Sequence, residues 1–105
     1  MPTPLEISTQ PGADGIPVVT VAGEIDISNA DRFRDALGLV AAADGGSFVV
    51  DLTGAEYLDS AGVHALFAYA SRIRLIAGPL LEPVLTVSGL SGITSVGGVS
   101  AGEPQ

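Results

Sequence analysis

The sequence predicts a single α/β domain, with a mixed four- to five-stranded sheet and helices packed against it. Its 105 residues suit one domain with a real core. Hydrophobic residues make up 47% of the chain and aromatic residues only 5%, so Val, Leu, Ile and Ala, which suit buried strands, must build that core. Segments with strand and helix periodicity alternate in the order β-β-α-β-α-β-α-β. We expect one domain over residues 1–105, with an ordered core at about 5–96 and a frayed tail at 97–105.

The N-terminal third predicts a hairpin followed by a helix. Residues 5–8 alternate between apolar and polar side chains and residues 16–22 are rich in β-branched side chains, which favours two strands. The Pro- and Gly-containing segment 11–15 between them predicts the turn. We expect Ser28 to cap the following helix, with Asp31 three residues later near its positive end. The apolar residues at helical spacing, which should be buried, are Phe33, Leu37, Val40 and Ala41.

A central strand and a second helix come next. Residues 44–46 (Asp-Gly-Gly) are expected to end the first helix, and residues 47–52 are nearly all apolar, as in a central strand. Residues 53–58 should connect this strand to a helix that begins at Asp59 or Ser60, which are both good N-caps. The expected buried face of this helix consists of Val63, Leu66, Phe67 and Ala70.

The segment 60–76 allows two interpretations. It could form one long helix, because Ile73 and Ala77 continue the apolar face. We favour a helix followed by a strand at 73–77, because the Gly-Pro pair at 78–79 is typical of the break after a strand.

The C-terminal segment predicts a short helix and an edge strand. Pro83 should open a helix that runs through Val87, with Gly89 as its left-handed stop. Residues 93–96 predict the last edge strand.

The charge of the chain argues against two classes of partner. The chain has twelve acidic residues and four basic ones, which are all arginine, so its net charge is −8. Nucleic acids and anionic membranes both need a cationic surface, so neither is an expected partner. Acidity of this degree either serves solubility or steers the protein towards a basic partner, and composition leaves both possibilities open.

The residue inventory also excludes several kinds of site. The chain has no cysteine, which excludes disulfides, thiolate metal sites and cysteine nucleophiles. With a single histidine and scattered carboxylates, we expect no metal site, and no Gly-rich loop stands where a nucleotide would require one, so no cofactor is predicted. The start of the chain lacks the pattern of a signal peptide and no apolar run reaches the length of a membrane span, so we expect a cytoplasmic protein.

Ser60 is the main candidate for a functional residue. It lies in the segment 59–62 (Asp-Ser-Ala-Gly), where its hydroxyl should be near free backbone N–H groups and the positive end of a helix dipole. A phosphate on that hydroxyl would add roughly −1.5 to −2 charges, and a helix N-terminus can accept it without refolding. Local sequence alone favours the simpler interpretation, in which Ser60 only caps the helix.

A hydrolase is an alternative, because Asp59, Ser60 and His64 all lie within about one helical turn. A catalytic triad needs an acid on the far side of the histidine and an oxyanion hole facing the serine. Asp59 is poorly placed for that role, and the glycines that flank a nucleophile elbow are absent. We therefore expect no enzymatic activity and assign His64 to the surface or to a partner contact.

Four segments occur in order at domain-scale spacing, and together they resemble the STAS family, within it the bacterial anti-sigma factor antagonists. They are GEID (23–26), VVDLT (49–53), LDSAGV (58–63), and VL with SGL (84–85 and 88–90). The resemblance covers roughly residues 5–96 and is most specific between Val49 and Leu66.

The resemblance implies a partner-switching regulator of transcription. Members of this family bind an anti-sigma factor that is also a serine kinase, which releases a sigma factor; ATP-dependent phosphorylation of a serine in the antagonist reverses this binding, and a phosphatase resets it. Carried over to this chain, Ser60 is the phosphoacceptor and Asp59 the aspartate that precedes it. The implied partner surface comprises Asp26, Asp59, Ser60, Ala61, Gly62 and His64.

The chain departs from the family pattern at two points. Ala61 stands where the family often has a second hydroxyl residue, so Ser60 is the only acceptor in the motif. The connection after the second helix is also shorter than is usual in the family. Two alternatives stay open: Asp26 could act only as a turn residue that bonds its own backbone, and the domain could be a docking module that is never phosphorylated.

Overall fold

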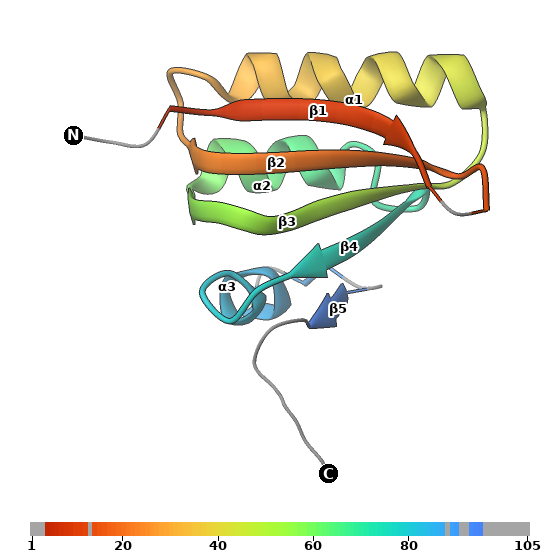
Figure 1. Ribbon diagram of the computed structural model, residues 1–105. Helices are drawn as coiled ribbons and strands as arrows, with labels where there is room; N and C mark the ends of the chain where they lie inside the picture. Colours follow the sequence, from red (N-terminus) through yellow and green to blue (C-terminus); the bar gives the residue numbers. More distant parts are fainter. Residues whose placement is uncertain (1–3, 13, 88, 91–92, 96–105) are drawn as a thin grey trace, which may run out of the picture.

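The computed structural model describes residues 4–12, 14–87, 89–90 and 93–95. The elements are β1 (Glu6–Pro11), β2 (Pro17–Ile25), α1 (Ala30–Asp44), β3 (Phe48–Leu58), α2 (Ser60–Phe67), β4 (Ile73–Ala77), α3 (Glu82–Val87) and β5 (Ile93–Ser95). The five strands form one sheet in the order β1-β2-β3-β4-β5, in which β1 is antiparallel to β2 and the other neighbours are parallel (Figure 1). The predicted fold class and element order are confirmed.

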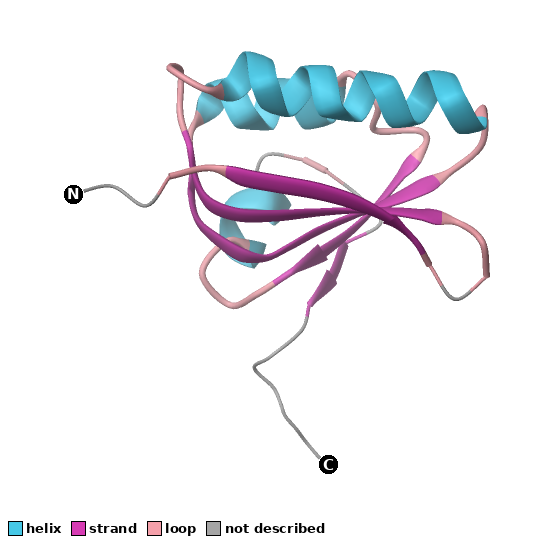
Figure 2. Cartoon of the chain, turned by 45° about the horizontal axis from the view of Figure 1, so that its top comes forward, coloured by secondary structure: helices cyan, strands magenta, loops and turns pink. Residues whose placement is uncertain are grey.

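The core lies between the sheet and the two longer helices. Figure 2 shows α1 and α2 together above the sheet and α3 apart from them, near β4 and β5. Alternate residues of β2, among them Val19 and Val21, are fully buried, as are Phe33 and Leu37 of α1. Because side chains alternate across a strand, this pattern shows which face of β2 the helices cover.

The first three strands are longer than the sequence indicated, whereas β4 has the predicted bounds. The observed β1 and β2 extend beyond the predicted segments 5–8 and 16–22. The expectation that residues 53–58 form a connection is wrong, because β3 continues through them to Leu58. Parallel pairing with β2 persists to Ile25 and Leu58 across two shifts of register, and this pairing overrides the weak strand preference of Gly54 and its neighbours.

The predicted start of α1 is wrong by one residue, whereas its face and its end are confirmed. The helix begins at Ala30, and Asn29 occupies the N-cap position without a side-chain capping bond. Ser28 does not cap the helix, because its backbone N–H and its hydroxyl both donate to Oδ1 of Asp26. Gly45 ends the helix in the left-handed conformation, with φ 78°. The four predicted core residues Phe33, Leu37, Val40 and Ala41 are all buried.

The preferred interpretation of residues 60–76 is confirmed, because α2 ends at Phe67 and a separate strand, β4, follows. The predicted face of α2 is partly wrong. Val63 and Leu66 are buried, but the helix rests on small residues beside them, and the Phe67 side chain is 45% exposed. Ala70 lies beyond the helix and packs partly buried against the core.

The C-terminal elements follow the prediction within a residue. The helix α3 starts one residue before Pro83, and Gly89 adopts φ 91° after it. The edge strand β5 pairs with β4. Val96 and the predicted tail 97–105 lie outside the described residues. In the part of the chain that the structure describes, no helix combines the length and apolar character that a bilayer crossing needs.

Arg72 joins the end of α1 to the segment between α2 and β4. Its Nη2 donates to the carbonyl oxygens of Ala41 (2.8 Å) and Gly46 (3.0 Å), and its Nε also donates to Gly46 at 3.1 Å. The Arg72 carbonyl accepts the N–H of Phe48 at 2.9 Å, where β3 begins. One half-buried side chain thus adds hydrogen bonds to two carbonyls, one in the last turn of α1 and one just after it.

We therefore expect Arg72→Met to lower the free energy of unfolding by about 1–3 kcal/mol, because it keeps the alkyl chain but removes every donor. Urea unfolding of both proteins measures the difference. Arg74→Met is the matched control: Arg74 is exposed on β4 and should change stability by less than about 0.5 kcal/mol. Equal losses from the two variants would contradict this role for Arg72.

Candidate functional site

The candidate site forms where β2 and β3 end. Because these strands are parallel, their carboxyl ends meet at one edge of the sheet, where Ile25 pairs with Leu58. The N–H of Asp59 extends this pairing by donating to the carbonyl of Ile25 at 3.1 Å. The turn after β2, which contains Asp26, therefore lies beside the start of α2.

Asp59, rather than Ser60, caps α2. Its Oδ1 accepts the N–H groups of Ala61 (2.9 Å) and Gly62 (3.2 Å), and its backbone is extended, with φ −93° and ψ −174°. Ser60 is the first helical residue, and its exposed hydroxyl has no hydrogen-bond partner among the described residues. The interpretation of Ser60 as a helix cap is therefore wrong, and its hydroxyl is available for chemistry.

Asp26 organises the turn that leads into α1. Its Oδ1 accepts the backbone N–H of Ser28 at 2.9 Å and the Ser28 hydroxyl, while its own N–H donates to Oδ1 of Asn29 at 2.9 Å. The Asn29 amide in turn donates to the carbonyl of Glu24 at 2.9 Å. The hydrogen bonds from Ser28, first the hydroxyl and then the N–H, hold the pKa of Asp26 below its usual value of 3.8. The turn role considered for Asp26 is confirmed, and its place on a partner surface stays a prediction.

Gly62 allows α2 to lie close to the ends of the strands. It is buried, and a Cβ at this position would lie 2.3 Å from Leu58 Cδ1 and 2.9 Å from Ile25 Cγ2. Both neighbours are buried core side chains, so a Cβ at this position would require the core to shift. Gly62 thus helps to position Ser60, whereas the half-buried Ala61 packs against the core and His64 is exposed.

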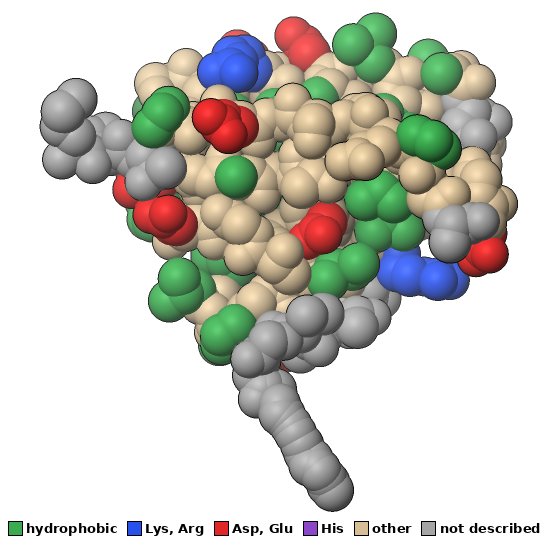
Figure 3. All heavy atoms as spheres, viewed as in Figure 1, with side chains coloured by type: hydrophobic (Ala, Val, Ile, Leu, Met, Phe, Trp, Pro, Cys, Tyr) green, Lys and Arg blue, Asp and Glu red, His purple; other side chains and the backbone are tan. Residues whose placement is uncertain are grey.

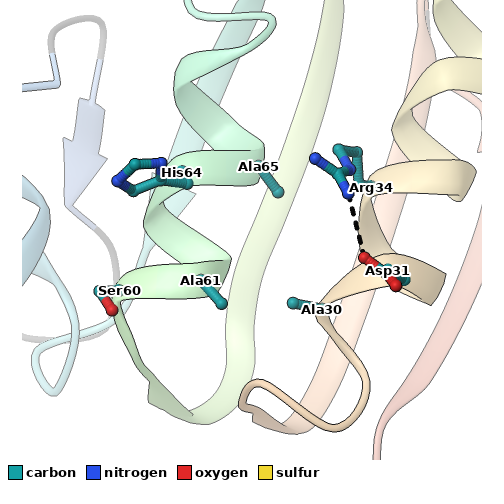
Figure 4. A pocket seen from close by; sticks show the side chains of 7 residues that line it. All are labelled: Ala30, Asp31, Arg34, Ser60, Ala61, His64 and Ala65. Atoms are coloured by element: carbon teal, nitrogen blue, oxygen red, sulfur yellow. Dashed lines mark hydrogen bonds and ion pairs between the residues drawn. The ribbon is translucent and has the colours of Figure 1, made fainter.

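Ser60 and His64 form a ridge between two hollows of the surface. The first hollow, about 330 Å³, lies between α1 and α2 and is lined by Ala30, Asp31, Arg34, Ser60, Ala61, His64 and Ala65 (Figure 4). The second, about 420 Å³, lies on the other side of α2 and is lined by Leu58, Asp59, Ser60, Val63, His64, Phe67 and Val84. The structure brings together all the predicted residues of the segment 59–64 except the buried Gly62.

Sequence reasoning did not assign several lining residues to the site, among them Arg34, Phe67 and Val84. Phe67 was assigned to the core, and Val84 was read only as part of a short helix. Arg34 stands at helical spacing from Ala30, which a helical projection could have revealed, but its approach to α2 depends on how the helices pack.

The geometry gives no support to the hydrolase alternative. The carboxylate of Asp59 accepts the N–H groups at the start of its own helix, and the described residues show no hydrogen bond between it and His64. Among the same residues, no group of three His, Asp or Glu side chains could hold a metal ion. On the face shown in Figure 3, acidic side chains are scattered over several elements and basic ones do not gather into a patch.

Comparison with known proteins establishes the family. The family model described as the STAS domain matches residues 8–81, which is more than half of the chain. The chain belongs to the STAS domain family.

Its relatives within that family are anti-sigma factor antagonists. It is 35% identical over 60 residues to the anti-sigma-F factor antagonist RsfB of Mycobacterium tuberculosis; the match covers 57% of this chain and 49% of that protein, so it spans about half the length of this relative. The crystal structure of an anti-sigma factor antagonist from Mycobacterium paratuberculosis is 30% identical, with a TM-score of 0.74 over 83% of this chain and 80% of the other. The unphosphorylated anti-sigma factor antagonist SpoIIAA shares the fold, with a TM-score of 0.62 over 90% of each chain, at 15% identity.

The capping role of Asp59 predicts a contrast between two substitutions. Asp59→Ala removes the acceptor of two N–H groups and should cost about 1 kcal/mol of stability. Asp59→Asn keeps an acceptor oxygen and should cost much less. Urea unfolding of both variants checks the contrast, which fails if Asn and Ala are equally destabilising.

The turn at Asp26 predicts a pH effect. Ser28→Ala removes the main hydrogen bond to the carboxylate and should raise the pKa of Asp26 towards 3.8. A group whose pKa is lowered on folding stabilises the protein above its unfolded pKa and loses this effect as the pH falls through the folded value. The stability difference between the parent and Ser28→Ala should therefore shrink as the pH falls below 3.8.

Carboxyl-carbon NMR of Asp26 measures the pKa, and urea unfolding at several pH values measures the stability difference. An unchanged pKa in Ser28→Ala would contradict the assigned cause.

Proposed function

We propose that this STAS domain is an anti-sigma factor antagonist that is switched off by phosphorylation of Ser60. In its unmodified form it binds an anti-sigma factor with serine kinase activity, so that a sigma factor is released. A phosphatase that acts on phosphorylated Ser60 restores binding. The domain itself is not an enzyme and acts in the cytoplasm, without nucleic acid, membrane or cofactor.

The observation that carries this proposal is the division of roles at the start of α2. Asp59 caps α2, so the exposed hydroxyl of Ser60 is not needed as a cap and makes no hydrogen bond among the described residues. The similarity to anti-sigma factor antagonists over most of the chain supports the class of function.

The modification is a phosphoryl transfer from ATP. The oxygen of the Ser60 hydroxyl forms a bond to the γ-phosphorus, the bond between that phosphorus and the β–γ bridging oxygen breaks, ADP leaves, and the hydroxyl proton passes to a base of the kinase. The kinase supplies the nucleotide site and the metal ion. The exposure of Ser60 at the rim of both hollows gives such an enzyme access to the hydroxyl.

The added charge explains why a complex would dissociate. The phosphate brings roughly −1.5 to −2 charges next to Asp59. Burying them at an interface without partners costs several kcal/mol, which changes affinity by orders of magnitude. A partner that fits the unmodified surface would therefore bind the phosphorylated protein much more weakly.

The partner surface that we propose extends the predicted residues by an apolar patch. The predicted residues of this surface are Asp26, Asp59, Ser60, Ala61, Gly62 and His64; Asp59, Ser60, Ala61 and His64 line the hollows, and Asp26 follows β2 beside the start of α2. Beside them, the second hollow presents the half-exposed Phe67 and Val84. An apolar centre within a charged rim is the usual composition of a specific protein interface.

The first prediction of this function concerns binding. Ser60→Ala should keep its affinity for the anti-sigma factor in the presence of ATP, whereas Ser60→Asp should weaken it about tenfold or more. Isothermal titration calorimetry with the purified partner measures both. Ser71→Asp places the same charge at an exposed position in the turn between α2 and β4 and should leave affinity unchanged. Equal binding by Ser60→Ala and Ser60→Asp would contradict the switch.

Intact-mass analysis after incubation with the kinase and ATP separates the switch from a constitutive docking module. The switch requires the mass of one phosphate on the parent protein and none on Ser60→Ala. A parent protein that binds the partner but gains no phosphate would instead support the docking module.

A further inference from the structure

We propose that Arg34 of α1 and His64 of α2 form the binding site for the phosphate that Ser60 carries once it is modified. This inference rests on the proposed phosphorylation of Ser60 and adds to it a specific state of the modified protein, in which the phosphate is held between the two helices.

The three residues line the same hollow. Ser60, His64 and Arg34 share the space between α1 and α2. Figure 4 shows the Arg34 side chain extending from α1 towards Ala65, while Ala61 and Ala30 point into the gap between the helices. In the same view the side chains of Ser60 and His64 lie on the side of α2 away from α1, so a phosphate on Ser60 has to turn past the methyl group of Ala61 to meet Arg34. Ala61, which removes a second hydroxyl from the motif, also keeps this path open.

His64 supplies the second contact from the helix of Ser60 itself. Residues four apart on a helix are neighbours on one face, with their Cβ atoms about 5–6 Å apart. Both side chains are exposed and line both hollows. An anion one turn before a cation is the favourable order on a helix, because each charge then opposes the dipole at its end.

Arg34 is available because its present ion pair is weak. Its Nη2 contacts Oδ1 of Asp31 at 3.0 Å, but the two side chains are 58% and 88% exposed. A pair this exposed contributes little to stability. A phosphate offers more charge and three acceptor oxygens, and the planar guanidinium binds two of them at once, so it competes well with a single carboxylate.

The other arginines are engaged elsewhere or do not line this hollow. Arg72 donates to Ala41 and Gly46, and Arg32 donates to the carbonyl of Leu5 at 3.5 Å. Arg74 lies on β4. The ionisable groups that line the two hollows are therefore Arg34 and His64, which attract a phosphate, and Asp31 and Asp59, which repel it.

A bound phosphate would change the surface in two ways. It would add charge beside Asp59, and it would also occupy part of the first hollow and link α1 to α2. The partner would then meet a surface whose shape differs as well as its charge. The N–H groups of Ala61 and Gly62 already donate to Asp59, so the phosphate gains its contacts here from side chains rather than from these two N–H groups.

The test uses the full chain with phosphoserine introduced at position 60 during translation, which makes it independent of any kinase. Phosphorus NMR at low ionic strength gives the pH at which the phosphate loses its second proton, near 6 for free phosphoserine. The midpoint of the parent should lie about 0.5 unit or more below that of Arg34→Gln, because a nearby cation favours the dianion. His64→Gln should raise the midpoint less, and Arg34→Lys should keep most of the effect.

Arg74→Gln is the matched control, since it removes the same charge away from the hollow, and its midpoint should equal that of the parent. The proposal is overturned if Arg34→Gln leaves the midpoint unchanged, or shifts it no further than Arg74→Gln does. All variants alter exposed side chains, and circular dichroism confirms that each is folded. No kinase takes part in this NMR experiment. A negative NMR result would therefore contradict the phosphate site without contradicting the proposed switch, and a negative kinase reaction would contradict the switch without changing the NMR result.

Discussion

Parallel pairing of β2 with β3 is the constraint on which the rest of the structure depends. It brings the carboxyl ends of both strands to one edge of the sheet and thereby places the turn before α1 beside the start of α2. The hydrogen bond from the Asp59 N–H to the Ile25 carbonyl carries the pairing past the last strand residue. Gly62 then lets α2 settle on Leu58 and Ile25 at a distance that any Cβ would prevent. The position of Ser60 follows from these contacts rather than from any bond of its own side chain.

The sequence was sufficient for the fold class, the order of elements and most of the core. These features depend on periodicity, which reports burial directly, and the buried residues of α1 illustrate it. The same information could not predict that β3 runs on to Leu58, because Thr53 and Gly54 become strand residues only through pairing with β2. It also misplaced Phe67, whose helical spacing matches a core position although the helix ends at this residue and leaves its ring at the surface.

The candidate site shows a similar limit. The motif identified Ser60 and its neighbours, but two adjacent residues that are both good N-caps left the capping role undecided. Only the hydrogen bonds of Asp59 resolve it. At the other helix, Ser28 has a suitable sequence position for a cap, yet the carboxylate of Asp26 takes both of its donors. Arg34 lines the first hollow because of the way α1 packs beside α2, and no local sequence pattern reports that packing.

The two aspartates and the serine of the site differ in how far the fold depends on them. Asp26 and Asp59 each use one carboxylate oxygen to accept donors, Asp26 in the turn before α1 and Asp59 at the start of α2, so a change at either disturbs the backbone that shapes the surface. Ser60 stands between the elements they organise, and its hydroxyl takes no part in the hydrogen bonds of the described residues. A covalent change at Ser60 therefore alters surface charge at little cost to folding, whereas the same charge added at a capping residue would compete with the cap. A site that must change its charge repeatedly while it keeps its structure requires this separation between the residues that build it and the residue that is modified.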